Sequence, residues 1–532
     1  MPESVEPSPG TQRRELILLL TAWLVLAVVA VLFAKQNLSV PGLYYDEAVF
    51  GGMAKDFVTG RLHGQHMPDH QTITFAGRPF PLFVQTYLGA LKSWMLIPAF
   101  ALFGATGAVL RASNLFWQLI ALLLLMLAAR RWRGLGTALM TGALLAFDPT
   151  FFFLSTLDWG VAVPSLVCRC ACFYFAVRWN QLRNLRDAFL VGLFAGLGFF
   201  NKADFSVFLI AIAVATLVCY WREMFAAIRQ CTGSLALACV GFAVGAGPML
   251  FKIPRMIALT VSGPHPNATG EFGVKLKTLM SIYDGSHFYR LMNAGGVFER
   301  MYEGAPGPQA LSGVAVVFAC VSVFAVAYKR SQRVRAVVFL TLIGVLITLG
   351  VFILPDAVRI HHAFLAYPFA QLMIAAAISL TWSAKALLRI VTVLALAVVC
   401  GTGLRSIAAT QELIRETGGR GRWSDSFDRF CRENQSRSDL TIISLDWGFN
   451  EQLMLLTDGP QLSEPFWSFN QTLPPLPEDP NYVYLAHPPE YSVLKYDVAY
   501  LNQLQANVNV EITPYVDRQN QVAFYAIRFR PQ

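Results

Sequence analysis

Two adjacent carboxylates, Asp46 and Glu47, are the residues in this sequence with the clearest potential for chemistry. They follow the first long apolar run and precede the segment 49–54, a pattern that predicts a helix lying on a membrane surface. A carboxylate in that position can act as a general base that removes the proton of an acceptor hydroxyl. A structural alternative is that Asp46 caps the helix while Glu47 favours its first turn through the helix dipole. The local sequence leaves both interpretations open.

A further carboxylate, Asp158, lies in a short loop between two later apolar runs. It has no basic partner in its own loop, and an uncompensated charge beside a membrane span is costly unless it is used. Asp148 lies in the same loop but directly before Pro149, and this pair is typical of a turn. We therefore expect Asp158, rather than Asp148, to be the second carboxylate of a site with Asp46.

Several cations lie near the ends of apolar runs. They are Arg78, Lys202, Arg359, His361 and His362. Contact with solvent or lipid headgroups would account for any one of them alone. If they gather with Asp46 on one face of the membrane, they can bind an anion such as phosphate. Carboxylates that act on a hydroxyl, beside cations that bind phosphate, suit sugar transfer from a lipid-phosphate donor.

The composition shows what kind of protein must position these residues. Of 532 residues, 55% are hydrophobic and only 14% are charged, whereas soluble proteins carry about 25% charged residues. This excludes an ordinary soluble enzyme and a disordered chain. In a membrane protein the basic residues of individual loops reflect the orientation in the membrane, so the net charge of +9 does not indicate a nucleic-acid partner. Eleven apolar runs are candidate spans: 16–34, 112–129, 135–153, 161–177, 188–200, 205–221, 232–252, 311–328, 336–354, 363–382 and 387–407.

The positions of the basic clusters predict the orientation, because such clusters stay on the cytoplasmic side. The clusters at Arg14 and Arg130 require an even number of crossings between them, so the apolar stretch 82–103 should lie along the interface or re-enter from outside. The first run lacks a convincing cleavage signal and is expected to be a retained anchor. The N-terminus is then inside and the C-terminus outside, with external loops at 35–111 and 253–310.

The chain changes character at about residue 408, which divides it into a membrane domain (1–407) and a small external α/β domain (408–532). Beyond this point the sequence is polar, and acidic residues outnumber basic ones. Short strand-like runs occur at 440–445, 482–485 and 522–529, separated by Pro and Gly turns. The Pro-rich stretch 473–480 is expected to be a loop within this domain.

Ordered motifs along the first half of the chain carry a family resemblance. They are Asp46-Glu47-Ala48, Gly77-Arg78-Pro79-Phe80-Pro81-Leu82, Leu102-Phe103-Gly104, Arg111-Ala112-Ser113 and Leu197-Gly198-Phe199-Phe200-Asn201-Lys202. The set resembles the membrane glycosyltransferases of the GT-C superfamily, particularly the protein O-mannosyltransferase and aminoarabinose-transferase branch. The first motif is similar to that branch's DE motif, the second to its KPP segment, and the last to the end of its fifth span. The resemblance covers about residues 16–252, and the remaining spans agree by layout.

The resemblance implies a polytopic α-helical GT-C fold and an inverting glycosyltransferase. Asp46 would be the catalytic base, while Glu47 and Asp158 would orient the acceptor or the sugar. The donor would be a polyprenyl-phosphate sugar, and the acceptor a hydroxyl on a protein, a lipid or a glycan. Cations at the site would stabilise the phosphate leaving group: Arg78 and Lys202, together with Arg359 or His362. The expected location is a bacterial inner membrane, among its lipids, with the active site on the periplasmic face.

The chain departs from the family pattern at two positions. Arg78 replaces the usual Lys of the KPP segment, and a guanidinium can bind phosphate with two hydrogen bonds. Gly77 stands where some relatives have a Glu that can take part in metal binding. No cofactor is therefore expected. A divalent cation at His265 or at the His361–His362 pair has no ligand spacing to support it.

Two other functional classes are considered. A transporter or lipid flippase would show charged or broken segments in mid-span and symmetry between its halves, whereas here the charges gather at span ends and no inverted repeat is found. An inactive relative that binds a glycolipid is the third possibility, and the presence of Asp46 argues against it.

Overall fold

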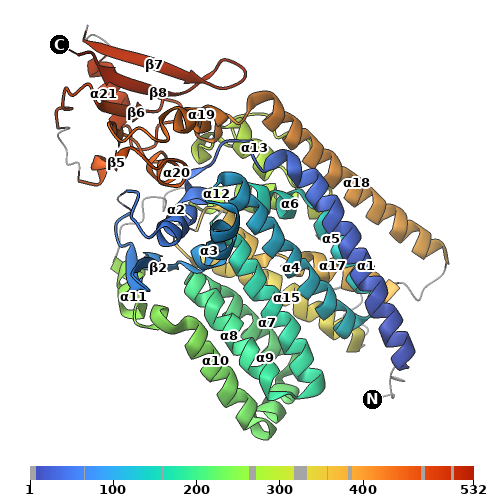
Figure 1. Cartoon of the computed structure of the whole chain (residues 1–532). Coiled ribbons are helices and arrows are strands. Elements are labelled where there is room, and N and C mark those ends of the chain that lie inside the picture. Colours follow the sequence, from blue (N-terminus) through green and yellow to red (C-terminus); the bar gives the residue numbers. More distant parts are fainter. Residues whose placement is uncertain are drawn as a thin grey trace.

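The computed structural model describes residues 8–64, 66–157, 160–262, 271–316, 332–355, 357–381, 386–468, 474–504 and 509–531. Long helices form the larger part of the molecule, and a domain with a β-sheet covers one end of them (Figure 1). The helices outside that domain are α1 (Pro9–Ala34), α2 (Tyr45–Thr59), α3 (Leu91–Phe103), α4 (Gly107–Arg133), α5 (Leu135–Ala146), α6 (Pro149–Thr156), α7 (Ala162–Leu182), α8 (Leu185–Asn201), α9 (Phe205–Gln230), α10 (Thr232–Leu250), α11 (Ile253–Ser262), α12 (Glu271–Tyr283), α13 (His287–Asn293), α15 (Gln332–Ile353), α16 (Ile360–Ala363), α17 (Phe369–Thr381) and α18 (Ala386–Thr417).

The molecule is an integral multi-pass membrane protein. Among the described residues, seven helices are long and apolar enough to cross a bilayer, or eight if α5 and α6, which meet at 63°, form one broken span. The seven are Pro9–Asn37, Gly107–Arg133, Phe205–Gln230, Thr232–Leu250, Val334–Ile353, Ile360–Ser379 and Arg389–Thr417. The predicted spans at 161–177 and 188–200 correspond to α7 and α8, which pack against each other and against α4 and α10 respectively. The predicted span 311–328 lies mostly outside the described residues, so the total of eleven stays a prediction.

The apolar stretch 82–103 forms no membrane-spanning helix. Its first residues belong to a small antiparallel sheet with the order β1 (Gln71–Phe75), β2 (Arg78–Gln85) and β3 (Leu88–Gly89). The rest forms α3, whose 13 residues extend for only about 20 Å at 1.5 Å per residue. A bilayer core is about 30 Å thick. This length agrees with the expectation that the stretch lies along the interface or re-enters.

The C-terminal domain is a five-stranded mixed sheet with the order β5-β4-β6-β8-β7. Its elements are α19 (Asp425–Asn434), β4 (Thr441–Ser444), α20 (Asn450–Leu456), β5 (Gln461–Ser463), β6 (Tyr482–Ala486), α21 (Tyr496–Leu504), β7 (Val510–Val516) and β8 (Val522–Phe529). The three predicted strands correspond to β4, β6 and β8. Helix α18 continues to Thr417, so the domain begins after the predicted boundary at 408.

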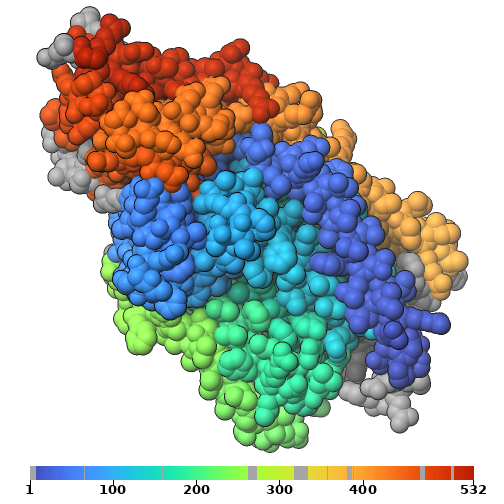
Figure 2. All heavy atoms as spheres, in the orientation of Figure 1, coloured from blue at the N-terminus to red at the C-terminus, as the bar shows by residue number. Residues whose placement is uncertain are grey.

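The C-terminal domain and the first loop are packed closely. In Figure 2 the orange C-terminal residues cover the blue residues of the first loop. Helix α2 lies between α20 and the start of α4, and side chains from both neighbours come close to the α2 backbone at Gly51. A Cβ at Gly51 would lie 2.9 Å from the Leu110 side chain and 3.0 Å from that of Leu455. A glycine in mid-helix costs up to about 1 kcal/mol relative to Ala, and here it permits the three elements to meet.

Candidate active site

A cavity of about 230 Å³ lies where the first loop, the ends of several membrane helices and the C-terminal domain meet. Its polar wall includes Asp46, Lys202 and His361, and its aromatic wall includes Tyr45, Phe50, Tyr87 and Trp447. Trp447, which follows β4, is the residue that the C-terminal domain contributes. The cavity therefore brings one candidate base and two candidate phosphate-binding residues from distant parts of the sequence onto one surface.

Asp46 is the second residue of α2 and is half-buried at the cavity wall. Burial raises the pKa of its carboxyl group to about 6, because a charged carboxylate loses solvation there. Nearby cations oppose this shift by favouring the charged form. They are, in order of effect, Arg359, Lys202, Lys92 and Arg422. A carboxyl group with a pKa just below neutrality is mostly ionised at pH 7 and can still accept a proton efficiently.

Glu47 points away from Asp46 and is fully buried. Its carboxylate accepts two hydrogen bonds from the Arg111 guanidinium, at 2.9 Å from Nε and 2.7 Å from Nη2. It also accepts one from the backbone N–H of Tyr44, at 3.0 Å. The N-cap residue of α2 is Tyr44, and Glu47 accepts its backbone N–H, so Asp46 does not cap the helix as the structural alternative supposed. In this structure Glu47 is a positioning residue, and it is not among the residues that line the cavity.

Lys202 lies in the turn between α8 and α9 and is held by polar neighbours. Its Nζ is 3.2 Å from Asp204 Oδ2 and 3.4 Å from His362 Nε2, and His362 Nδ1 is 2.8 Å from the same Asp204 oxygen. Burial alone would raise the pKa of Asp204, but Lys202 and His362 lower it to about 2. His362 therefore supports Lys202 through Asp204, while its neighbour His361 faces the cavity.

Two expected cations are placed differently from each other. Arg359 precedes α16, and its guanidinium lies 3.7 Å from the centre of the Phe298 ring, close enough to Asp46 to influence its pKa. Arg78 is exposed at the start of β2 and donates a hydrogen bond of 2.8 Å to the carbonyl of Val58, in the last turn of α2. At 1.5 Å per residue, Asp46 and Val58 are roughly 18 Å apart along the helix. The structure thus does not bring Arg78 to the cavity.

Asp158 lies outside the described residues, as does His265. Gly160 and Val161, which follow Asp158 closely in the sequence, line the cavity. The expected role of Asp158 stays a prediction.

Two residues near Asp46, Lys92 and Trp447, were not predicted from the sequence. Lys92 is buried on α3 with its Nζ 5.3 Å from the centre of the Phe50 ring. Burial lowers its pKa to about 7, although the carboxylates of Glu47 and Asp46 favour the charged form. The sequence did contain a signal for Lys92, because it is a single cation in an otherwise apolar stretch. Trp447 gave no signal, since its place at the cavity depends on the docking of a separate domain.

One group of potential metal ligands converges among the described residues: Asp446, His487 and Asp497, whose ligand atoms all lie within 4.8 Å of one another. Its oxygens already accept hydrogen bonds. Asp446 accepts from Arg422 at 3.0 Å and from two backbone N–H groups, and Asp497 accepts from Ser492 and from the His487 backbone. This network fixes the loop that carries Trp447 and leaves few free lone pairs for an ion.

Known proteins provide an independent comparison. Residues 90–245 match the profile of the dolichyl-phosphate-mannose-protein mannosyltransferase family. The structure of ArnT from Cupriavidus metallidurans bound to undecaprenyl phosphate is similar with a TM-score of 0.58 at 13% identity, over 96% of this chain and 100% of that one. This likeness shows that the chain has the same fold as ArnT, a GT-C fold. The expected GT-C fold is thus confirmed, and within this fold Asp46 lines the cavity.

Two other solved structures are similar to this chain. The apo state of the same ArnT gives the same TM-score of 0.58, identity of 13% and coverage of 96% of this chain. The apo oligosaccharyltransferase of Archaeoglobus fulgidus gives a TM-score of 0.46 at 14% identity, over 84% of this chain and 65% of that one. No curated protein matches the sequence.

Proposed function

We propose that this GT-C protein is an inverting glycosyltransferase that moves a sugar from a polyprenyl-phosphate donor to an acceptor hydroxyl. The observation that carries the proposal is the shared cavity of Asp46 and Lys202. It places a carboxylate with a pKa of about 6 beside a cation held by Asp204. A base and an anion-binding group on one small surface are the two parts that this transfer requires.

The reaction moves one proton and exchanges one bond at the anomeric carbon. Asp46 takes the proton of the acceptor hydroxyl as its oxygen forms a bond to that carbon. The bond between the anomeric carbon and the phosphate oxygen breaks on the opposite face, which inverts the configuration. The leaving polyprenyl phosphate gains a negative charge, and Lys202 and Arg359 stabilise it. A phosphate leaves without protonation, so a separate general acid is not needed.

The lipid-linked donor is supported by the family profile and by the fold. The profile describes mannosyltransferases that use dolichyl phosphate mannose, and the similar ArnT binds undecaprenyl phosphate. A polyprenyl chain would remain among the membrane helices while its phosphate reaches the turn of Lys202. The cavity of about 230 Å³ is smaller than the 300–1,000 Å³ typical of drug-sized ligands. This size suits a single sugar.

The site is assigned to the external face, and in a bacterium to the periplasmic face of the inner membrane. The basic clusters at span ends support this orientation. The acceptor is a hydroxyl of a protein, a lipid or a glycan, and it would approach between α2 and Trp447.

Mass spectrometry of envelope glycoproteins, glycolipids and glycans tests the proposal in cells with and without this chain. We expect at least one sugar modification to disappear without the chain and to return with the wild-type protein but not with Asp46→Asn. Asp69→Asn is a matched control, because Asp69 is a partly exposed carboxylate of the same loop that pairs with Arg255. Identical profiles with and without the chain would overturn the proposed function.

A further inference from the structure

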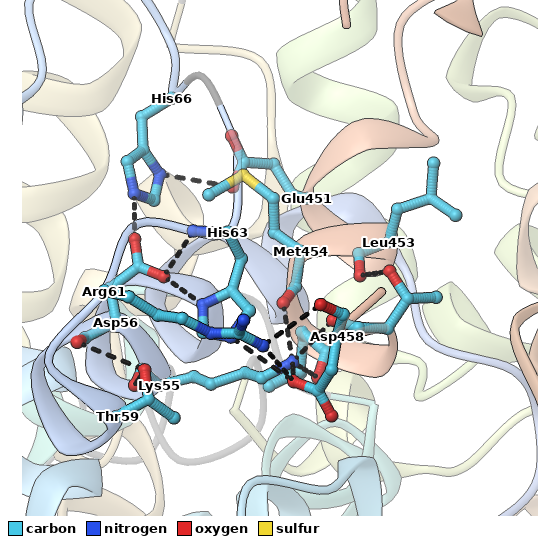
Figure 3. Close-up of polar contacts among 12 residues, drawn as sticks. Lys55, Asp56, Thr59, Arg61, His63, His66, Glu451, Leu453, Met454 and Asp458 are labelled. Atoms are coloured by element: carbon cyan, nitrogen blue, oxygen red, sulfur yellow. Dashed lines mark hydrogen bonds and ion pairs between the residues drawn. The ribbon is translucent and has the colours of Figure 1, made fainter. Parts of the chain in front are cut away.

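A cluster of histidines and carboxylates joins the first loop to α20 of the C-terminal domain (Figure 3). The histidines are His63, His66 and His70, and Asp56 and Glu451 complete the cluster. Its charged groups come from both sides of the interface, since Asp56 belongs to α2 and Glu451 to α20. Asp56 follows Asp46 by roughly 15 Å along the helix, whereas the other end of the cluster adjoins the candidate active site, since Met67, next to His66, lines its cavity.

Several buried atoms of the cluster have no hydrogen-bond partner. They are both carboxylate oxygens of Glu451, Nδ1 of His66 and both ring nitrogens of His70. Glu451 is fully buried, and the His66 side chain is only 6% exposed. Buried polar groups almost always find a partner, and an unpaired buried carboxylate is particularly costly. Glu451 has one ionic partner here, His66, whose Nδ1 lies 3.8 Å from Oε2, so the interface holds several potential ligand atoms that no hydrogen bond occupies.

The hydrogen bonding of His66 prepares one of these nitrogens to bind a metal. His66 Nε2 lies 2.7 Å from Asp56 Oδ2, as expected for an N–H that donates to the carboxylate. Nδ1 faces Glu451, with 3.8 Å between Nδ1 and Oε2. Burial lowers the pKa of His66, but Asp56 and Glu451 raise it to about 9, so an ion would bind Nδ1 in place of a proton. Metal-binding histidines commonly donate their other N–H to a carboxylate in this way, which fixes the ring and strengthens the ligand.

The distance between His66 and Glu451 also suits a bridging ion. At 3.8 Å the two atoms are too far apart for a hydrogen bond. Two ligands bound to zinc at about 2.0–2.2 Å are separated by about 3.4 Å at a tetrahedral angle, and by up to about 4 Å when the angle opens. The third candidate ligand, His70, has its ring centre 4.1 Å from that of His66.

We propose that His66, His70 and Glu451 bind a divalent transition-metal ion, with zinc favoured, that fastens the first loop to the C-terminal domain. Imidazole and carboxylate ligands suit zinc. The three ligand atoms do not yet all lie within 4.8 Å of one another, as those of the Asp446 group do. Binding therefore includes a rotation of the His70 ring toward Glu451. The Asp446 group has the shorter spacing, but its oxygens are already hydrogen-bonded, whereas neither oxygen of Glu451 accepts a hydrogen bond and only Oε2 pairs with His66, at 3.8 Å.

The test uses the full-length protein purified in detergent without a histidine tag. After incubation with zinc chloride and removal of excess ion, metal content is measured by plasma mass spectrometry, and the melting temperature is recorded with zinc and with a chelator. We expect about one zinc per wild-type chain and a higher melting temperature with zinc. His66→Ala and Glu451→Gln should lose both effects. His63→Gln is the matched control, because both ring nitrogens of His63 already contact Asp56 and Asp458.

Two results would overturn the inference. The first is a wild-type protein that retains no stoichiometric metal and melts at the same temperature with zinc and with chelator. His66 would then be a protonated imidazole that bridges the two carboxylates. The second is equal zinc content in the wild type and in Glu451→Gln, which would place the ion elsewhere. Neither result depends on sugar transfer, so the inference and the proposed function fail separately.

Discussion

The titration of Asp46 gives the most direct test of its role as base. Transfer requires the ionised carboxylate, so the rate should fall as the pH drops through the pKa of about 6. A group with this pKa is about 90% ionised at pH 7 and about 10% ionised at pH 5, so kcat/KM at pH 5 should be about a tenth of its value at pH 7. The donor is a phosphodiester and does not titrate in this range.

The assay measures initial transfer rates from a radiolabelled polyprenyl-phosphate sugar between pH 4.5 and 8, once the product is known. Asp46→Asn should lower the rate by about 10²–10⁴-fold and abolish the fall in rate at low pH, the acid limb of the pH–rate profile. In Lys202→Ala, the remaining activity should begin to fall at a higher pH than in the wild type, because Lys202 favours the charged form of Asp46.

Two outcomes would refute this reasoning. A limb centred near pH 4 would show that burial does not raise the pKa of Asp46 in the working enzyme. A limb that persists unchanged in Asp46→Asn would assign the titration to another group. Melting temperatures at pH 5 and pH 7 serve as the control, since unfolding at low pH would mimic loss of activity.

The remaining predictions concern stability, donor binding and topology. Arg111→Met should lower the melting temperature strongly, because removing one partner of a buried ion pair costs about 3–5 kcal/mol, and an unchanged melting curve would contradict this. Lys202→Ala should raise the donor KM, since a charged hydrogen bond to an anion contributes about 1.5–3 kcal/mol. Arg78→Ala should instead lower the stability of α2. Equal donor kinetics in Lys202→Ala and wild type would remove Lys202 from the site. A reporter after Gln532 should lie outside the membrane and one near Gln332 inside. Protection of the reporter after Gln532 from external protease would contradict this orientation.

The sequence predicted the parts of the fold that depend on local patterns. Apolar runs located the helices of the membrane domain, and short β-branched runs located β4, β6 and β8. Consecutive residues of a helix point in different directions, and the structure separates the two members of the DE pair. Asp46 lines the cavity, whereas Glu47 pairs with Arg111 away from it, so the expected contact of Glu47 with the acceptor or sugar is not seen.

The contacts that complete the site join residues that are far apart in the chain. Arg111 is 64 positions from Glu47, and no local pattern in a single sequence links the two. Arg78 is the opposite case, a residue expected at the site that the structure places elsewhere. Its type and motif suggested phosphate binding, but the strand β2 directs it to the carbonyls at the end of α2. Residue type alone does not determine where a long flexible side chain finds its partner.

The close packing of α2 against the C-terminal domain limits how such a protein can evolve. Lys55 of α2 donates hydrogen bonds to the carbonyls of Met454, Leu455 and Thr457 at the end of α20. The same helix carries Asp46 at its other end. Exchange of the C-terminal domain between relatives would therefore disturb the helix that carries Asp46 unless the first loop were exchanged with it. The two segments are expected to be inherited as one module, although nearly the whole membrane domain separates them in the sequence.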